Sequence, residues 1–276
     1  MKVGYLGPRN SFTFQAADYC FDEMLLEPFS SIPNCLNALK RNKIDYAIVP
    51  IENSLEGSVH TSMDGLFQQD DIKIIQEIIL PIKQQLLVSK KGIVPKKILS
   101  HPQALAQSQL FLEKYYPDVF LEPVSSTTHA ANYVSNHKNE AIAAIASREA
   151  AEEYHLEILA EDIQDNRFNQ TRFWLLGKEK LEKSHQLSIE KMTLFLTLPN
   201  NVPGILHKVL SAFAWREIDL SKIESRPLKT ELGEYYFILD IPVHNNIELI
   251  EYALEEIELL GANVQNLGYY PIVVKE

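Results

Sequence analysis

The side chains that could do chemistry in this 276-residue sequence are mainly hydroxyls and amides in loops between predicted strands and helices. Thr171 and Arg172 are adjacent at the start of one predicted strand, where a hydroxyl can donate a hydrogen bond and a guanidinium can clamp a carboxylate. Ser100 precedes Pro102 at a predicted helix start, and the N–H groups of a helix start favour anions. These groups suit the binding of an anionic small molecule.

Two other sets of side chains offer acid–base chemistry. His101 and His129 titrate near neutral pH, so either could donate a proton, although a histidine in a turn more commonly has a structural role. Glu161, Asp162 and Asp165 could form a paired-carboxylate site, but we interpret them as a solvated loop.

Composition and missing motifs exclude several classes of function. The sequence contains no GxGxxG, GxxxxGK[ST], GxSxG or HExxH motif, and its eight histidines show no metal-binding spacing. We therefore expect neither a cofactor nor a metal. The formal net charge is −11, from 26 Lys and Arg against 37 Asp and Glu. A chain this acidic lacks the basic stripe that binds nucleic acid and is poorly matched to an anionic membrane surface.

The cysteines and apolar runs indicate a cellular location. Cys20 and Cys35 have neither a paired spacing nor a metal-finger pattern, which suits two reduced thiols in a reducing compartment. The first ten residues become polar too early for a signal peptide, and the apolar run Ile74–Ile82 is too short to span a bilayer. We expect a cytoplasmic protein.

The elements that must position the polar loops alternate between strands and helices over roughly residues 1–178. The pattern predicts strands at 2–6, 45–51, 72–89 with a break at Pro81, 98–100, 119–124, 141–146, 157–163 and 172–176. It predicts helices at 11–21, 31–41, 58–67 and 102–115, one toward His137 and one after Ser147, with Ser11, Thr127 or Thr128, and Ser147 as caps. This alternation predicts mostly parallel sheets in two lobes joined by crossing strands, with the ligand bound between the lobes.

The pattern changes after a charged stretch at residues 179–190, which we interpret as a linker. Strands are then predicted at 192–198, 220–227, 235–243 and from 262, with helices at 203–215 and 247–260. The order βαββαβ is that of a ferredoxin-like unit. The sequence therefore predicts two domains.

Six blocks within these loops resemble, in order, the signatures of the prephenate dehydratases, and the resemblance spans nearly the whole chain. The blocks are Gly4–Pro8 with Ser11–Phe12, Pro50–Ser54 with Gly57–Val59, Ser100–Gln103 with Gln107, Asn169–Phe173, Pro203–Leu206 and Glu224–Pro227. The fourth (NQTRF) is the most specific, and the last two are similar to the phenylalanine-binding motifs of ACT domains. One position departs from the family: Ile205 stands where alanine is usual, a bulkier side chain that bears on effector affinity and selectivity.

The resemblance implies an α/β fold with a two-lobed, periplasmic-binding-protein-like catalytic domain at residues 1–178 and a ferredoxin-like ACT regulatory domain at 191–276. The lobes would comprise about 1–75 with 165–178, and about 76–164. The implied reaction is the decarboxylating dehydration of prephenate to phenylpyruvate in L-phenylalanine biosynthesis. The protein would then be a carbon–oxygen lyase.

The resemblance also implies roles for individual residues. Thr171 would be the catalytic residue, as a hydrogen-bond donor to the leaving hydroxyl or a proton relay, because its hydroxyl is too weakly acidic for a simple general acid. Without the resemblance, a structural hydrogen bond would be the commoner role of a strand threonine. The implied substrate-binding residues are Asn53, Ser54, Ser100, Gln107 and Arg172. For Arg172, an ion pair with Glu52 is an equal alternative, since adjacent strand residues point to opposite faces.

The ACT domain implies L-phenylalanine as an allosteric inhibitor. The implied effector-binding residues are Asn201, Gly204, Ile205, Leu206, Glu224 and Ser225. Gly204 would let the backbone approach the ligand, and the helix start after it would favour a carboxylate. ACT domains typically pair side by side, which implies a homodimer or homotetramer.

Two other functions are kept as alternatives. The same lyase chemistry on arogenate would need a counter-charge for the substrate ammonium, and the sequence does not identify one. A two-lobed solute-binding sensor without catalysis would share the predicted architecture, but an intact Asn169–Phe173 block argues against it.

Overall fold

The computed structural model describes residues 1–67, 69–179, 181, 187–199, 203–230, 233–244 and 247–275. The chain divides into two compact units. The first comprises Met1–Ser62, Ile79–Phe173 and the stretch from Val274, and the second comprises Met63–Ile78 and Trp174–Val273.

The strands of the first unit that lie within Met1–Ser62 belong to one sheet, which begins with parallel strands. β1 (Val3–Leu6) pairs in parallel with β2 (Leu26–Phe29) and β3 (Tyr46–Asn53), and β4 (Gly57–Ser58) pairs antiparallel with β3. The strand order is β16-β5-β11-β3-β1-β2, where β5 is Lys73–Pro81, β11 is Gln170–Gly177 and β16 is Ile272–Val274. Gly4 leaves no room for a side chain, because an added Cβ would lie 2.5 Å from Ile44 Cδ1 and 3.0 Å from Cys35 Sγ of the helix at Ile32–Lys40.

The helices beside this sheet begin where the sequence predicts. α1 (Phe12–Cys20) is capped by Ser11, whose Oγ accepts a hydrogen bond from Phe14 N at 3.2 Å. α2 (Ile32–Lys40) is capped in the same way by Ser31. A single 3₁₀ turn covers Glu23–Leu25, and α3 covers His60–Leu66. The capping role expected for Ser11 is confirmed.

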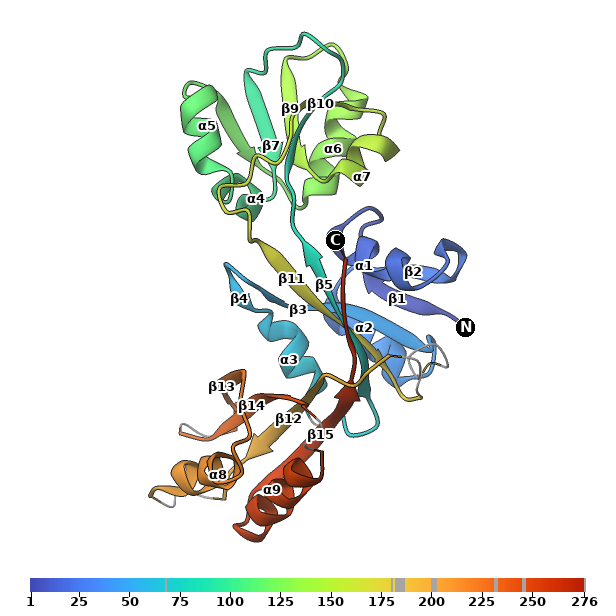
Figure 1. Cartoon of the computed structure of the whole chain (residues 1–276). Coiled ribbons are helices and arrows are strands. Elements are labelled where there is room, and N and C mark those ends of the chain that lie inside the picture. Colours follow the sequence, from blue (N-terminus) through green and yellow to red (C-terminus); the bar gives the residue numbers. More distant parts are fainter. Residues whose placement is uncertain are drawn as a thin grey trace. The chain divides into compact units, whose positions relative to one another are not determined.

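The other sheet of the first unit has the strand order β10-β6-β9-β7-β8. Its strands are β6 (Gln85–Val88), β7 (Lys97–Ser100), β8 (Phe120–Pro123), β9 (Ile142–Ala146) and β10 (Glu157–Ala160). Its helices are α4 (Pro102–Ala106), α5 (Gln109–Tyr115), α6 (Thr127–Asn136) and α7 (Arg148–Glu153). Figure 1 shows α4 and α5 on one side of β7 and β9, with α6 and α7 on the other. Both faces are covered, so β9 is apolar and buried throughout.

Three details of this unit differ from the sequence prediction. The sheets are mixed, because β6 runs antiparallel to β9 and β10 while β7 is parallel to β8 and β9. The helix predicted at 102–115 is two helices, interrupted at Gln107 and Ser108. The cap of α6 is Ser126, whose Oγ accepts from His129 N at 3.0 Å, and neither Thr127 nor Thr128.

The second unit contains a four-stranded antiparallel sheet with the order β13-β14-β12-β15. Along the chain the elements are β12 (Lys191–Thr197), α8 (Ile205–Ala214), β13 (Lys222–Pro227), β14 (Tyr235–Pro242), α9 (Ile247–Leu259) and β15 (Asn263–Tyr270). This is the βαββαβ order that the sequence predicts. The apolar faces of α8 and α9 pack on β12 through Leu194, Leu196, Val209, Phe213 and Ile250.

The segment 63–78 packs within the second unit. Phe67 stacks on Tyr236 of β14 with ring centroids 4.1 Å apart. Further along, the buried carboxylate of Glu77 accepts hydrogen bonds from Lys191 Nζ at 2.7 Å and Trp174 Nε1 at 3.2 Å. These contacts give a buried charge the partners that it needs.

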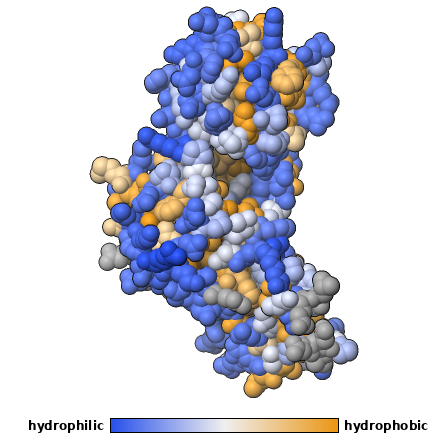
Figure 2. All heavy atoms as spheres, turned by 180° about the vertical axis from the view of Figure 1, so that it is seen from behind, coloured by the Kyte–Doolittle hydropathy of each residue, from blue (hydrophilic) through white to orange (hydrophobic). Residues whose placement is uncertain are grey.

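Hydrophilic residues cover most of the face in Figure 2, and apolar residues lie on it in separate groups. In the part of the chain that the structure describes, every helix is too short or too polar to cross a bilayer.

Candidate active site

A cavity of about 680 Å³ opens in the first unit, and polar side chains from strands β3 and β11, from helices and from loops line it. They are Ser11, Thr13, Ser30, Asn53, Gln84, His101, Gln103, Gln107, Ser125, Ser126, Thr127, Thr128, His129, Asn132, Tyr154 and Thr171. None of the described lining residues is Asp, Glu, Lys or Arg. The polar part of the cavity lining therefore consists of neutral hydrogen-bond donors and acceptors, including two imidazoles.

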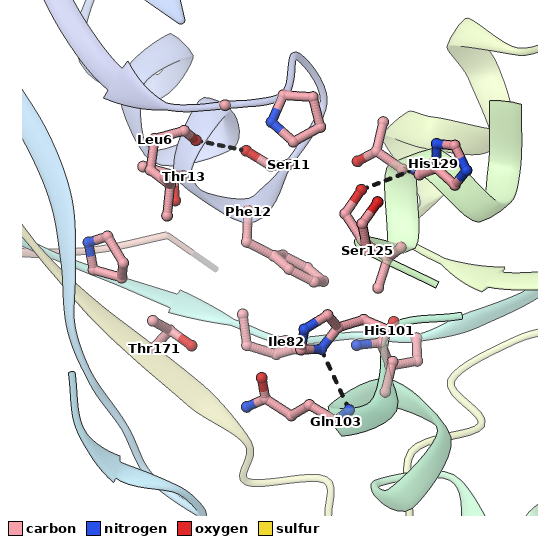
Figure 3. A pocket seen from close by; sticks show the side chains of 18 of the residues that line it. Leu6, Ser11, Phe12, Thr13, Ile82, His101, Gln103, Ser125, His129 and Thr171 are labelled. Atoms are coloured by element: carbon pink, nitrogen blue, oxygen red, sulfur yellow. Dashed lines mark hydrogen bonds between the residues drawn. The ribbon is translucent and has the colours of Figure 1, made fainter. Parts of the chain in front are cut away.

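Thr171 lies on β11 at this cavity, with the ring of Phe12 and the side chains of Ile82 and His101 around the same space (Figure 3). Its Oγ1 accepts a hydrogen bond from Asn53 Nδ2 at 2.9 Å. Because the oxygen is used as an acceptor, the hydroxyl hydrogen is left to donate to a molecule in the cavity. A leaving hydroxyl needs a hydrogen-bond donor of this kind, because negative charge develops on its oxygen.

Asn53 and Gln107 are joined behind the cavity wall by Asn169. Asn53 Nδ2 donates to Asn169 Oδ1 at 2.8 Å, and Asn169 Nδ2 donates to Gln107 Oε1 at 2.9 Å. All three side chains are buried, yet Gln107 Nε2 has no partner among the described residues. A buried donor without a partner costs free energy unless a ligand or water accepts from it.

Arg172 does not line the cavity. Its Nη1 donates to Glu52 Oε2 at 2.6 Å, and both side chains are largely buried. The alternation of β11 places Thr171 toward the cavity and Arg172 toward Glu52. The ion pair considered as an alternative is thus present, and the substrate-binding role stays a prediction.

Ser54 and Ser100 also lie outside the described cavity lining. Ser100 is fully buried, and its Oγ donates to Ile145 O at 2.6 Å. Ser54 ties two loops together: its Oγ donates to Phe168 O at 3.2 Å and accepts from Gln170 N at 3.0 Å. Both serines support the residues around the cavity, and direct contact with substrate stays a prediction for each.

The two histidines considered as acids both line the cavity. His101 caps α4: its Nδ1 accepts from Gln103 N at 3.3 Å, so a neutral His101 carries its proton on Nε2. His129 lies in the first turn of α6. Either ring can reach a ligand, and His101 also has the structural role expected of a turn histidine.

The three acids at 161–165 do not form a paired-carboxylate site. Glu161 pairs with Arg148 at 2.9 Å on the surface, and Asp162 Oδ1 accepts from Gln85 Nε2 at 3.1 Å. Asp165 accepts from the N–H groups of Leu110 and Phe111 at the start of α5. Their partners are structural, in keeping with the loop interpretation. No group of metal-ligating side chains occurs among the described residues.

Sequence reasoning missed much of the wall that the start of α6 contributes. Ser125, Ser126, Thr127 and Asn132 line the cavity, as does Thr128, whose buried Oγ1 has no partner in the described chain. The starts of α1 and α6 both reach the cavity, and N–H groups at a helix start attract anions. The run of four hydroxyl residues at the start of α6 was a usable signal.

The implied effector residues lie in the second unit. Gly204 precedes α8 with φ +79°, and a Cβ added there would meet no atom of the described residues within 4 Å. Ile205 and Leu206 form the first turn of α8, while Glu224 and Ser225 lie on β13, at one end of the strand order of their sheet. Asn201 and half of the expected linker at 179–190 lie outside the described residues.

Comparison with known proteins agrees with this geometry. A family model described as "Prephenate dehydratase" matches residues 3–181, and one described as "ACT domain" matches residues 192–259. The prephenate dehydratase of Lactococcus lactis subsp. cremoris is 47% identical, over 99% of this chain and 98% of that protein. That of Bacillus subtilis is 44% identical over 98% of each.

A solved structure is similar over nearly the whole chain. The prephenate dehydratase of Arthrobacter aurescens, in complex with L-Phe, has a TM-score of 0.84 and 31% identity over 98% of this chain and 90% of that one. The chain thus combines a mixed α/β unit that carries a polar cavity with a ferredoxin-like unit of the ACT type. The chain belongs to the prephenate dehydratase family and is a hydro-lyase with a C-terminal ACT domain.

Proposed function

We propose that the cavity binds prephenate and that Thr171 catalyses its conversion to phenylpyruvate. The observation that carries this proposal is the hydrogen bond from Asn53 Nδ2 to Thr171 Oγ1, which leaves the Thr171 hydrogen to be donated. In the reaction the bond from the ring to its carboxylate breaks, its electron pair enters the ring, and the hydroxyl on the opposite ring carbon leaves. Carbon dioxide and water are released as the ring becomes aromatic.

Thr171 acts on the leaving oxygen. Its hydroxyl donates to the departing hydroxide, where negative charge develops, and donors placed at such a position typically contribute about 100- to 1000-fold in rate. The proton that completes the water comes through this hydroxyl from solvent or from an imidazole of the cavity wall. His101 and His129 are the titratable imidazoles among the described lining residues.

The two carboxylates of prephenate are held by neutral donors. Both carboxylates are attached through the ring carbon opposite the leaving hydroxyl, so they lie on the far side of the ring from Thr171. The starts of α1 and α6, the Thr128 hydroxyl and Gln107 Nε2 supply donors to the cavity. Directional hydrogen bonds from these neutral donors orient the substrate without ion pairs. This orientation favours the alignment in which carbon dioxide and hydroxide leave together.

The neutral lining of the cavity also favours prephenate over arogenate as the substrate. Arogenate carries an ammonium group, and burying that group would need a carboxylate partner. The described cavity lining contains no Asp or Glu. The experiment is to measure phenylpyruvate formation from prephenate and phenylalanine formation from arogenate with the same enzyme. A kcat/KM that favours prephenate at least tenfold is expected, and equal or reversed values would overturn this assignment.

Solute binding without catalysis is the remaining alternative. The same assay tests it, because a binding protein would deplete neither substrate. Tight prephenate binding in calorimetry together with no product would overturn the assignment of catalysis to this cavity.

Regulation by L-phenylalanine through residues 191–276 completes the proposal. The matched ACT domain and the L-Phe complex of the Arthrobacter aurescens relative support it. Gly204, Ile205, Leu206, Glu224 and Ser225 are the described residues that we assign to effector binding, with Asn201 beside them in sequence. β13 stands at the end of its strand order, where a second copy could add its own sheet, so a homodimer or homotetramer is the proposed assembly. Titration of the activity with L-phenylalanine tests the regulation, and unchanged activity at saturation would refute it.

Domain limits and location are proposals as well. We assign catalysis to residues 1–178 and treat 179–190 as the linker, which the matched ranges 3–181 and 192–259 support. A cytoplasmic location is supported by Cys20 and Cys35, two thiols without a disulfide, which suit a reducing compartment.

A further inference from the structure

The amide side chains of Asn53, Asn169 and Gln107 form a hydrogen-bonded chain whose direction is fixed at one end. An amide can usually be turned by 180° because its oxygen and nitrogen have nearly the same shape. Here Asn53 Oδ1 accepts from Leu55 N at 3.0 Å and from Glu56 N at 3.2 Å. A backbone N–H can only donate, so the oxygen of Asn53 must face these two groups.

This constraint passes along the whole chain of amides. Since its oxygen is fixed, Asn53 presents Nδ2 to Asn169 Oδ1 and to Thr171 Oγ1, at 2.8 and 2.9 Å. Asn169 must then turn Nδ2 toward Gln107, whose Oε1 accepts at 2.9 Å. Gln107 is left with Nε2 at the cavity, buried and without a partner in the described chain.

The direction thus ends in two hydrogen-bond donors at the cavity: the hydroxyl of Thr171 and the Nε2 of Gln107. We propose that Asn169 is a positioning residue that sets the hydrogen-bond polarity of the substrate cavity. Its side chain is 1% exposed and is absent from the cavity lining, so it acts through Asn53 and Gln107. The inference rests on the proposed function, because prephenate presents its carboxylate and leaving-group oxygens as acceptors and needs donors opposite them.

Asn169→Asp tests this proposal directly, because it replaces the Nδ2 donor by an oxygen acceptor and leaves the shape of the side chain almost unchanged. The carboxylate still accepts from Asn53, but it cannot donate to Gln107. Gln107 then turns, donates Nε2 to residue 169 and presents its oxygen to the substrate. We expect kcat/KM for prephenate at pH 8 to fall about 100-fold, the usual effect of losing one preorganised donor.

The pH dependence of the Asn169→Asp variant shows whether Asn169 sets the direction of the hydrogen bonds or only supports the structure. A carboxyl at 169 would be buried between the amides of Asn53 and Gln107, and burial without a cation beside it raises the pKa of a carboxyl above its usual range. As the pH falls through that pKa, the protonated carboxyl can again donate to Gln107. The ratio of wild-type to variant kcat/KM should therefore shrink by at least tenfold between pH 8 and pH 5.

Two further variants complete the experiment. Gln170→Glu places the same charge one residue away on an exposed side chain, and it should stay within twofold of wild type. Asn169→Ala removes both hydrogen bonds and should lose activity equally at both pH values. A loss in Asn169→Asp that is independent of pH, or activity within twofold of wild type at pH 8, would overturn the proposal. If Asn169→Asp does not fold at pH 8, Gln107→Glu carries the same test, since it also replaces the donor by an acceptor that protonation restores.

A measurement without substrate distinguishes failure of this inference from failure of the proposed function. The side-chain amide protons of Gln107, assigned in ¹⁵N-labelled protein by their loss in Gln107→Met, should exchange freely in wild type. In Asn169→Asp at pH 8 one of them should shift downfield and be protected as it binds the new carboxylate. Identical resonances in both proteins would refute the polarity argument even if prephenate were not the substrate.

Discussion

Arg226 donates two hydrogen bonds to one carboxylate oxygen of Asp64, from Nε at 3.1 Å and Nη2 at 2.8 Å, although 162 positions separate the two residues. Lys229 Nζ and Tyr236 Oη donate to the same carboxylate, at 2.6 and 3.0 Å. α3 is thereby fastened to β13, the strand that also carries Glu224. Burial alone would raise the pKa of Asp64, but these three donors outweigh it and lower the pKa.

Asp64→Asn should therefore destabilise the protein in a pH-dependent way. A carboxylate with a lowered pKa contributes stability above its unfolded pKa, near 4, and loses that contribution as the pH falls through the folded value. We expect the variant to lose about 1–2 kcal/mol at pH 7 and much less at pH 3, measured by urea unfolding. An equal loss at both pH values would mean that packing, and not charge, accounts for the effect.

Ser100→Ala should act on stability more than on chemistry. The variant removes the fully buried hydroxyl that donates to Ile145 O and leaves that carbonyl with one donor fewer. A loss of about 1–2 kcal/mol in unfolding free energy is expected, with KM for prephenate within threefold of wild type. A tenfold higher KM in a variant of unchanged stability would instead indicate that Ser100 contacts the substrate directly.

The periodicity of the sequence predicted most elements because local signals and tertiary packing agree in them. Ser11, Ser31 and Ser147 cap the helices that they precede, and the apolar segment at 141–146 is a strand covered on both faces. The break between α4 and α5 was missed because its residues, Gln107 and Ser108, carry no Gly or Pro signal. Gln107 ends α4 there and reaches Asn169 through a contact 62 residues away, which no local pattern encodes.

The candidate site was predicted in part for a related reason. Asn53, Gln107 and Thr171 were named from motif resemblance, and the structure brings them together at one cavity. Ser100 and Arg172 belong to the same motifs but face Ile145 and Glu52 instead. A motif records which residues occur together, whereas the face of a strand decides which of them reaches the cavity.

The Arg172–Glu52 pair gives a third prediction. Arg172→Met and Glu52→Gln should each destabilise by about 1–3 kcal/mol, and the double variant by clearly less than the sum, because either change alone leaves a largely buried charge with fewer partners. Chemical denaturation of the four proteins measures the coupling. If Arg172 clamps substrate instead, Arg172→Met alone would raise KM and the stabilities would add.

Gly204→Ala probes the sensor. At φ +79° an alanine is strained by about 1–2 kcal/mol, although no atom of the described residues lies within 4 Å of its Cβ. The turn before α8 should shift, and the L-phenylalanine concentration for half-inhibition should rise at least fivefold while kcat stays within twofold. Unchanged inhibition in a folded variant would remove Gly204 from the effector site.

The most direct test of the account is the turnover of prephenate by Thr171→Ala and Thr171→Ser. Serine keeps a hydroxyl that can accept from Asn53 and donate to the leaving oxygen, whereas alanine keeps neither. We predict that kcat falls about 100- to 1000-fold in Thr171→Ala, with KM changed little, and at most about tenfold in Thr171→Ser. A folded Thr171→Ala enzyme that keeps a third or more of wild-type kcat would contradict the assignment of Thr171 as the donor to the leaving hydroxyl.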